Sequence, residues 1–149
     1  MLSSIKEYQP GPQIPPSIWM TLRLPSRGTR LHDLVREGLP FEFLERIARL
    51  LQVQPGVIAK AICMSPTTMA RRAKGGRFNT VESDRLVALV TLFDEALSLF
   101  ENNKAAAIEW IALPVRGLGS KLPIEMLGTR VETKAVLDFI GQLEEGVLV

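Results

Sequence analysis

From residue 39 onward, apolar side chains recur at intervals of three and four residues, and no stretch sustains an alternation of period two. This pattern predicts an all-α fold. A first helix begins near Pro40 and a second, shorter one at Pro55, because proline suits the first turn of a helix. The positions expected to face the interior in these two helices are Phe41, Leu44, Ile47, Ala48, Leu51, Val57, Ile58, Ala61 and Ile62.

Two further helices follow in the middle of the chain. Ser65 is a suitable N-cap for a short helix over residues 66–74, which Gly75-Gly76 would end. Asn79 lies three residues before Glu82, the spacing of a capping box, and begins a long helix. One side of that helix carries an apolar stripe. In the simpler interpretation the stripe packs onto the rest of the domain, and in the alternative it forms the contact between two copies, a dimer seam. The residues of the seam would be Leu86, Val90, Phe93 and Leu97, with Phe100 continuing the stripe.

Residues 102–149 predict a small helical C-terminal region. A helix over 104–113 is closed by Pro114, and a loop over 115–122 leads to Pro123. Thr129 and Glu132 then have capping-box spacing, in which each side chain accepts from the other residue's amide. The last helix has apolar residues over much of its surface and stops at Gly146; these residues are Val131, Ala135, Leu137, Phe139, Ile140 and Leu143.

The end of this last helix is unusual in its charge. Glu144 and Glu145 lie where a helix favours cations, and three aliphatic residues, Val147-Leu148-Val149, follow Gly146. An acidic tip with an apolar tail suits a basic recess on another molecule. The simpler alternative is a solvated helix end.

Residues 1–39 contain prolines at 10, 12, 15, 16 and 25, which favour extended backbone, so we expect a proline-rich arm or a partly ordered lead-in. Part of this arm is expected to dock on a neighbouring part of the protein, because it is too apolar for a free linker. The residues concerned are Ile14, Ile18, Trp19, Met20, Leu22 and Leu24.

Composition excludes several classes of function. A net charge of +2 marks no global preference for nucleic acid, and one cysteine and one histidine exclude a disulfide framework or a Cys/His metal site. His32 is isolated, Cys63 is expected to be buried and inert, and no glycine-rich phosphate loop occurs. We therefore expect neither catalysis nor a cofactor. No apolar run is long enough to span a bilayer, so we expect a soluble cytoplasmic protein with no membrane partner.

The short helices around residues 56–74 have the order of a helix-turn-helix, in which the second helix enters the major groove of DNA. The residues expected to contact DNA are Ser65, Thr67, Thr68, Arg71, Arg72, Lys74 and Arg77. The alternative is an ordinary helical core with a solvated basic face. One copy offers few DNA contacts, so DNA binding would require a dimer.

Residues 40–149 also carry an ordered series of family motifs. Ser65 to Leu86 fit S-x-x-T-x-x-R-R, then G-R, then E-S-D-R-L, and the chain closes on Glu-Glu-Gly-Val. Between these blocks lie Trp110, Pro114, the Leu118-Gly119 turn, Pro123, Leu127, Thr129 and Val136. This series closely resembles the Xre/MbcA/ParS antitoxins that partner RES-domain toxins. Two positions depart from the family pattern, where Ser120 and Glu132 stand in place of glycines.

The resemblance implies a helix-turn-helix DNA-binding and dimerisation region at 40–101 and a toxin-binding region at 102–149. It also implies a homodimer that binds a RES-domain, NAD-degrading toxin and the operator DNA of its own operon. The C-terminal helix and tail would block the toxin's pocket, with contacts from Phe139, Gln142, Glu144, Glu145, Gly146, Val147, Leu148 and Val149. The competing interpretation is a stand-alone helix-turn-helix transcriptional regulator without a toxin.

Overall fold

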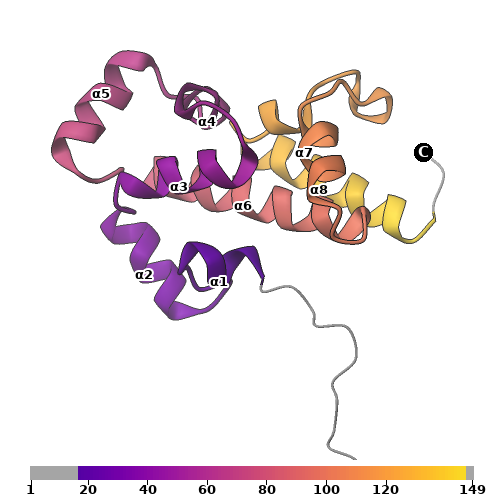
Figure 1. Cartoon of the computed structure of the whole chain (residues 1–149), viewed down its shortest axis with the longest axis horizontal. Helices are drawn as coiled ribbons and strands as arrows, with labels where there is room; N and C mark the ends of the chain where they lie inside the picture. The colour runs from indigo at the N-terminus through magenta and orange to yellow at the C-terminus, as the bar shows by residue number, and fades with distance from the viewer. Residues whose placement is uncertain (1–16, 147–149) are drawn as a thin grey trace, which may run out of the picture.

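The computed structural model describes residues 17–146 (Figure 1). In these residues the regular structure is helical and no β-sheet forms, which confirms the predicted all-α fold. The α-helices are α1 (Ile18–Leu22), α2 (Thr29–Glu37), α3 (Glu42–Leu51), α4 (Pro55–Ala61), α5 (Pro66–Gly75), α6 (Thr80–Leu99), α7 (Lys104–Ile111) and α8 (Arg130–Glu144). Two 3-10 helices, η2 (Arg116–Leu118) and η3 (Pro123–Glu125), lie between α7 and α8.

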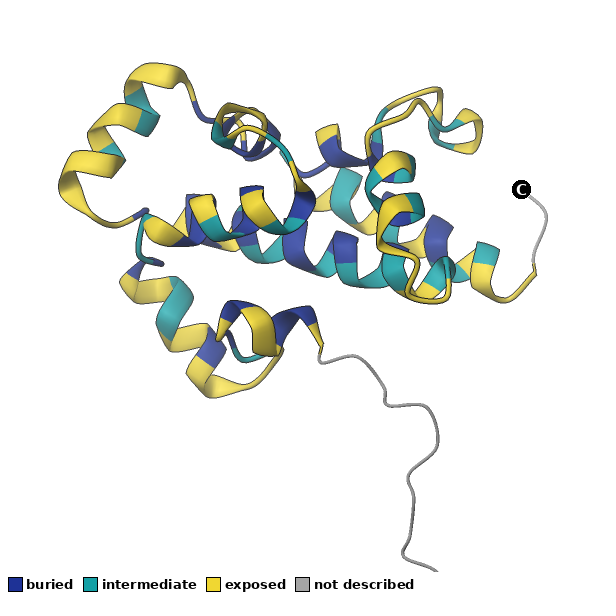
Figure 2. Ribbon diagram, in the orientation of Figure 1, coloured by how far each residue is buried: buried dark blue, intermediate teal, exposed yellow. Residues whose placement is uncertain are grey.

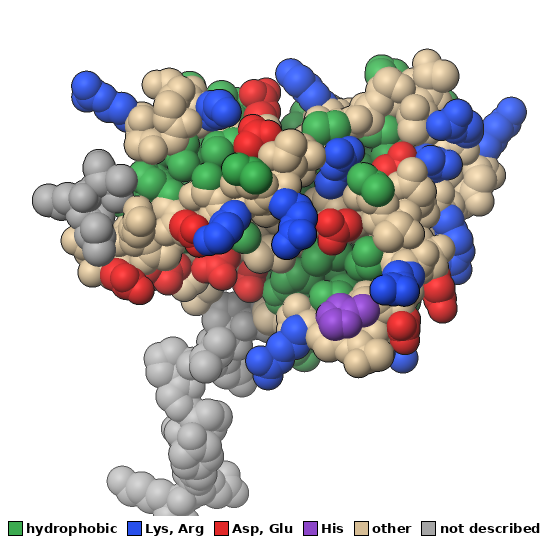
Figure 3. Space-filling view, turned by 180° about the vertical axis from the view of Figure 1, so that it is seen from behind, with side chains coloured by type: hydrophobic (Ala, Val, Ile, Leu, Met, Phe, Trp, Pro, Cys, Tyr) green, Lys and Arg blue, Asp and Glu red, His purple; other side chains and the backbone are tan. Residues whose placement is uncertain are grey.

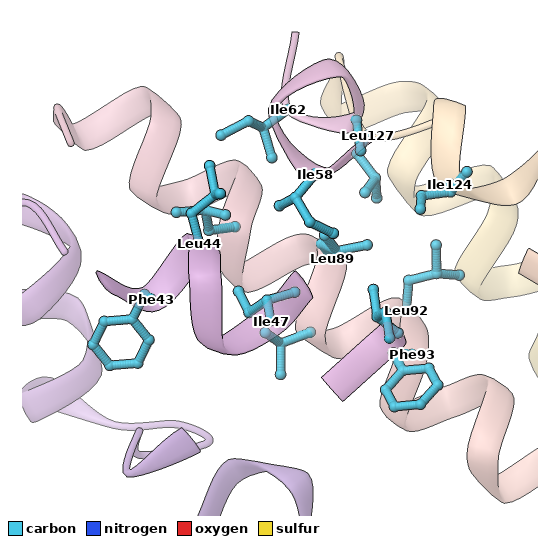
Figure 4. Close-up of a cluster of buried hydrophobic side chains, with 14 of the residues drawn as sticks. Phe43, Leu44, Ile47, Ile58, Ile62, Leu89, Leu92, Phe93, Ile124 and Leu127 are labelled. Carbon is cyan, nitrogen blue, oxygen red and sulfur yellow. The ribbon is translucent and has the colours of Figure 1, made fainter. Parts of the chain in front are cut away.

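The long helix α6 forms the centre of the fold. Its start has the full capping box: the Asn79 side chain accepts from the Glu82 amide, and the Glu82 carboxylate accepts from the Asn79 amide. Helices α2, α7 and α8 pack along it. Side chains from α3, α4, η3 and α6 meet in one core (Figure 4), which includes Leu44, Ile47, Ile58, Leu89, Leu92, Phe93, Ile124 and Leu127.

The apolar stripe of α6 faces this core. Leu86, Val90 and Phe93 are at most 2% exposed, and Leu97 is half-buried. Three of the four residues expected at a dimer seam are therefore unavailable to a second copy. The reason is that α6 has packing neighbours from both ends of the chain, so its stripe is covered within one copy.

In the expected arm or lead-in, the described residues 17–38 are helical rather than extended, and their apolar side chains dock on the fold as expected. Residues 17–38 form α1 and α2, and Ile18, Trp19 and Leu22 are buried against the rest of the fold (Figure 2). The indole Nε1 of Trp19 also donates to Oδ2 of Asp94 on α6, over 3.1 Å. Only Pro25 of the five prolines lies in this described part, between the two helices, so the prolines do not interrupt either helix.

Three smaller expectations also differ from the structure. Val57, expected to face inward, is 42% exposed. The Thr129 side chain caps the Glu132 amide, but the Glu132 carboxylate accepts from the Thr129 hydroxyl rather than from its amide. Cys63, the second residue after α4, has a φ of 63° and is exposed rather than buried.

In residues 17–146 no helix is both long and apolar enough to cross a bilayer. Within the same residues, no three His, Cys, Asp or Glu side chains are grouped so that they could hold a metal ion.

Candidate functional site

Helix α5, the second helix of the predicted helix-turn-helix, stands at the edge of the molecule (Figure 1). Its N-terminus is capped by Ser65, whose Oγ accepts from the Thr68 amide over 3.1 Å, and Pro66 occupies the first turn. Its C-terminus ends at Gly76, which has a φ of 81°. None of its residues is buried, and Figure 2 shows most of the helix as exposed. Such a helix presents most of its side chains to solvent.

The chain on either side of α5 is anchored. Met64 and Phe78 are buried at its two ends. Beyond its C-terminus, the Phe78 amide donates to the Leu39 carbonyl over 3.0 Å, and the Phe41 amide donates to the Gly76 carbonyl over 2.9 Å. These two hydrogen bonds tie the end of the helix-turn-helix to the segment between α2 and α3.

The residues expected to contact DNA separate into two groups. Exposed residues on or beside α5 are Ser65, Thr67, Arg71, Lys74 and Arg77, while Thr68 and Arg72 are half-buried. Arg77 uses Nη1 to donate to the Gly38 carbonyl over 2.7 Å. Arg72 departs from its expected place on the open face, because its Nε donates to Oε1 of Glu82 over 2.8 Å. Sequence spacing did not show this pair, since it joins two helices.

The predicted toxin-binding helix α8 is amphipathic and packs along α6. Its Phe139 is 8% exposed and closes over Gly117, where an added Cβ would lie 2.4 Å from the Phe139 ring. Phe139 therefore holds η2 against α8 rather than standing free. In the loop after η2, Ser120 takes a φ of 63°, so it adopts the left-handed conformation that glycine favours.

The exposed residues toward the end of α8 are Gln142, Glu144, Glu145 and Gly146. Val147, Leu148 and Val149 lie outside the described residues. This acidic region extends onto α6, which carries Asp94 and Glu95. Burial raises the pKa of the Glu95 carboxyl, and the nearby charges of Glu144 and Asp94 raise it further. Figure 3 shows acidic side chains gathered at this end of the molecule. We call Asp94, Glu95, Glu144 and Glu145 the acidic end.

Replacing Glu95 with Gln is expected to stabilise the protein at neutral pH. The folded-state pKa of Glu95 lies above its ordinary value of 4.5, so ionisation opposes folding. This cost is absent at a pH below the ordinary pKa, where both states are protonated, and it grows as the pH rises through the folded pKa. Urea unfolding should give a higher midpoint for Glu95→Gln at pH 7 and no difference near pH 4, with the exposed Glu109→Gln as the control. Equal midpoints at pH 7 would contradict the prediction that ionised Glu95 destabilises the folded protein.

A groove with a volume of about 1320 Å³ lies between α2, α6 and α8. Its lining includes Leu31, Val35, Val81, Ala88, Val131 and Leu137, with His32, Arg36, Asp84 and Arg130 among the polar residues. Figure 3 shows apolar side chains gathered beside the single histidine. Sequence analysis missed this groove because its α2 wall was assigned to the arm.

Comparison with known families divides the chain into two matched regions. Residues 30–90 match the antitoxin Xre-like helix-turn-helix domain, and residues 95–146 match the antitoxin Xre/MbcA/ParS C-terminal toxin-binding domain. The first match contains α2 and the whole of α3 to α5. The second contains the end of α6, helix α7 and the helix α8 with its acidic tip.

Two curated proteins are similar over most of their length. An Antitoxin Xre of Yersinia enterocolitica is 33% identical over 146 residues, which cover 96% of this chain and 99% of that protein. An Antitoxin Xre of Photorhabdus laumondii is 32% identical over 133 residues, 88% of this chain and 90% of that protein. With both domains matched in order and two full-length relatives, this chain belongs to the Xre antitoxin family.

Proposed function

We propose that this chain neutralises a RES-domain, NAD-degrading toxin by placing the end of α8 and the residues after it in the toxin's pocket. The acidic end carries the proposal. A pocket that takes an anionic dinucleotide needs positive charge near the phosphates, and Glu144 and Glu145 offer exposed carboxylates that complement it. The aliphatic tail of residues 147–149, which lies outside the described residues, would follow them into the apolar part of the pocket.

The free antitoxin holds these charges at a cost. Glu144 lies close enough to Glu95 to raise the pKa of its carboxyl, and both Glu144 and Glu145 lie at the negative end of the α8 dipole. A basic pocket would remove both unfavourable interactions. The charge arrangement is therefore better suited to a complex than to a free surface.

Co-expression distinguishes this function from that of a stand-alone regulator. The antitoxin should restore growth and the cellular NAD level in cells that produce its cognate RES-domain toxin. A regulator without a toxin partner would leave both unchanged. Purified antitoxin should also stop NAD loss in a reaction with the purified toxin, which excludes an indirect effect on toxin expression.

We propose in addition that α5 binds operator DNA in the promoter of its own operon and so represses it. Arg71 and Lys74 are exposed and lie three residues apart, which places them on one face of α5. Thr67, one turn before Arg71, is exposed near the N-terminus of the same helix, the part that meets base edges in this motif.

Replacing Arg71 and Lys74 together with alanine is expected to weaken binding to a duplex taken from upstream of the gene. Each lost phosphate contact should reduce the slope of log affinity against log salt by about 0.9. Fluorescence anisotropy at several salt concentrations measures this slope, and the double variant should still protect NAD from the toxin. A slope unchanged from that of the wild type would show that these two side chains do not contact phosphates.

We propose that two copies associate, because one α5 offers too few contacts for specific DNA binding. With most of the α6 stripe buried, the groove between α2, α6 and α8 is the better interface. It exposes Val81 and Val131, which are 56% and 80% exposed, and its lining includes charges of both signs, Arg130 and Asp84, which suit a self-complementary surface. Light scattering should give twice the 16.5 kDa chain mass for the wild type. A monomer at micromolar concentration would contradict this.

A further inference from the structure

We propose that the ion pair between Arg72 and Glu82 fixes the orientation of α5 for DNA binding, and that Arg72 is a positioning residue rather than a phosphate contact. The inference rests on the proposed binding of operator DNA. It changes the role expected for Arg72 from its place beside Arg71 in the sequence.

One carboxylate oxygen of Glu82 connects two helices. Its Oε1 accepts from Nε of Arg72 on α5 over 2.8 Å and from the Asn79 amide at the start of α6 over 2.9 Å. Glu82 is 8% exposed, the only charged residue in the described part of the chain that is buried. A buried carboxylate requires a cation or several hydrogen-bond donors, and here the cation is Arg72.

The pair supplies what the packing of α5 lacks. A helix usually takes its orientation from an apolar face buried in the core, but α5 buries no residue and its only core-packing side chain, Met69, is half-buried. Met64 and Phe78 anchor the chain at its two ends. These anchors fix where the helix begins and ends, and the pair adds a link from its second turn that determines which side faces solvent.

The geometry also opposes direct use of Arg72 on DNA. The Arg72 side chain is 25% exposed and that of Glu82 is 11% exposed, so the pair is largely removed from water. If Arg72 turned to a phosphate, Glu82 would stay buried without its cation. Arg71, one residue earlier, reaches solvent with no such constraint.

Replacing Glu82 with Gln distinguishes a positioning role of Arg72 from a phosphate contact, because the two roles predict opposite changes in affinity for DNA. Gln can still accept from the Asn79 amide, so the cap of α6 is kept while the charge is lost. We expect the dissociation constant for the upstream duplex to rise about tenfold, because α5 loses its orientation. A phosphate-contacting Arg72 would instead be released by this change, and binding would tighten. The matched control is Glu45→Gln, which makes the same change at an exposed carboxylate on α3, outside the groove, and should leave binding equal or slightly tighter.

The salt dependence of DNA affinity gives a second test of whether Arg72 positions α5 or contacts a phosphate. Arg72→Ala should weaken binding while leaving the slope of log affinity against log salt at its wild-type value. A slope reduced by about 0.9, as for a lost phosphate contact, would overturn the proposal.

Hydrogen exchange tests the ion pair without DNA, so that failure of DNA binding and failure of this inference remain distinct. In the free protein, amides of residues 69–75 should exchange about tenfold faster in Glu82→Gln than in wild type or Glu45→Gln. Unchanged exchange in Glu82→Gln would overturn the positioning role. If the wild type did not bind the duplex while these amides lost protection, operator binding would be refuted and the structural role of the pair upheld.

Discussion

Reversing both charges at the tip of α8, in E144K/E145K, is expected to abolish toxin neutralisation while the antitoxin stays folded. Cations are favoured at the C-terminus of a helix, and replacing Glu144 removes one source of the negative charge around Glu95. The double variant should therefore be at least as stable as the wild type. Loss of inhibition could then be assigned to the contact with the toxin.

The expected loss of affinity is at least about a hundredfold, or about 2.7 kcal/mol, because two charges that attract in the proposed complex become repulsive. Consumption of NAD by the purified toxin at increasing antitoxin concentrations measures it. Glu37→Lys is the matched control, since Glu37 is exposed at the C-terminus of α2, away from the end of α8 (Figure 1). It should inhibit as the wild type does.

Deleting residues 146–149 gives a separate test of the tail. Because this deletion keeps Glu144 and Glu145, it should impair inhibition through loss of the aliphatic residues alone. Full inhibition by E144K/E145K would refute the role of the acidic end, and full inhibition by the deletion would refute that of the tail.

Much of the fold follows from local signals in the sequence. The N-caps Ser65, Asn79 and Thr129 all begin helices in the structure, since a cap is decided by the residue and its next three neighbours. Helix α2 gave no such signal, because its N-cap is Gly28 and it buries only Leu31. Its place depends on α6, so its packing is a tertiary property.

At the candidate sites too, local sequence signals do not predict contacts between helices. Arg71 and Arg72 are adjacent and chemically identical, yet only Arg72 meets Glu82, ten residues further along. Phe139 was predicted to contact a toxin, but its ring packs against Gly117 of η2. The pattern of residues predicted the exposed helix α5 and the acidic tip of α8, but contacts between helices decide which of their side chains are free.

Replacing Gly38 with alanine is expected to cause the largest loss of stability among single substitutions at glycine. Gly38 has a φ of 95°, and an added Cβ would lie 2.1 Å from the backbone carbonyl oxygen of Phe78. That carbonyl belongs to the segment that anchors the end of α5 and cannot move aside as a flexible side chain could. The substitution should therefore separate Leu39 from Phe78 and release the anchor.

Gly28→Ala is the matched comparison, because Gly28 has nearly the same φ, 94°, with nothing within 4 Å of an added Cβ. Its free energy of unfolding should fall by only about 1–3 kcal/mol, the cost of holding alanine at this φ. Gly38→Ala should lose about 1–3 kcal/mol more through overpacking, measured as the difference in free energy of unfolding in urea.

Gly38→Ala should also weaken DNA binding in the fraction that remains folded, since the Gly38 carbonyl accepts from Arg77 and its neighbour Leu39 pairs with Phe78. Gly28→Ala should bind DNA as the wild type does, because Gly28 lies between α1 and α2 and contacts neither end of α5. Equal losses of stability in the two variants would mean that Phe78 yields without cost. The anchor at the end of α5 would then be too weak to position it, and the orientation of the DNA-facing helix would depend on Arg72 and Glu82 alone.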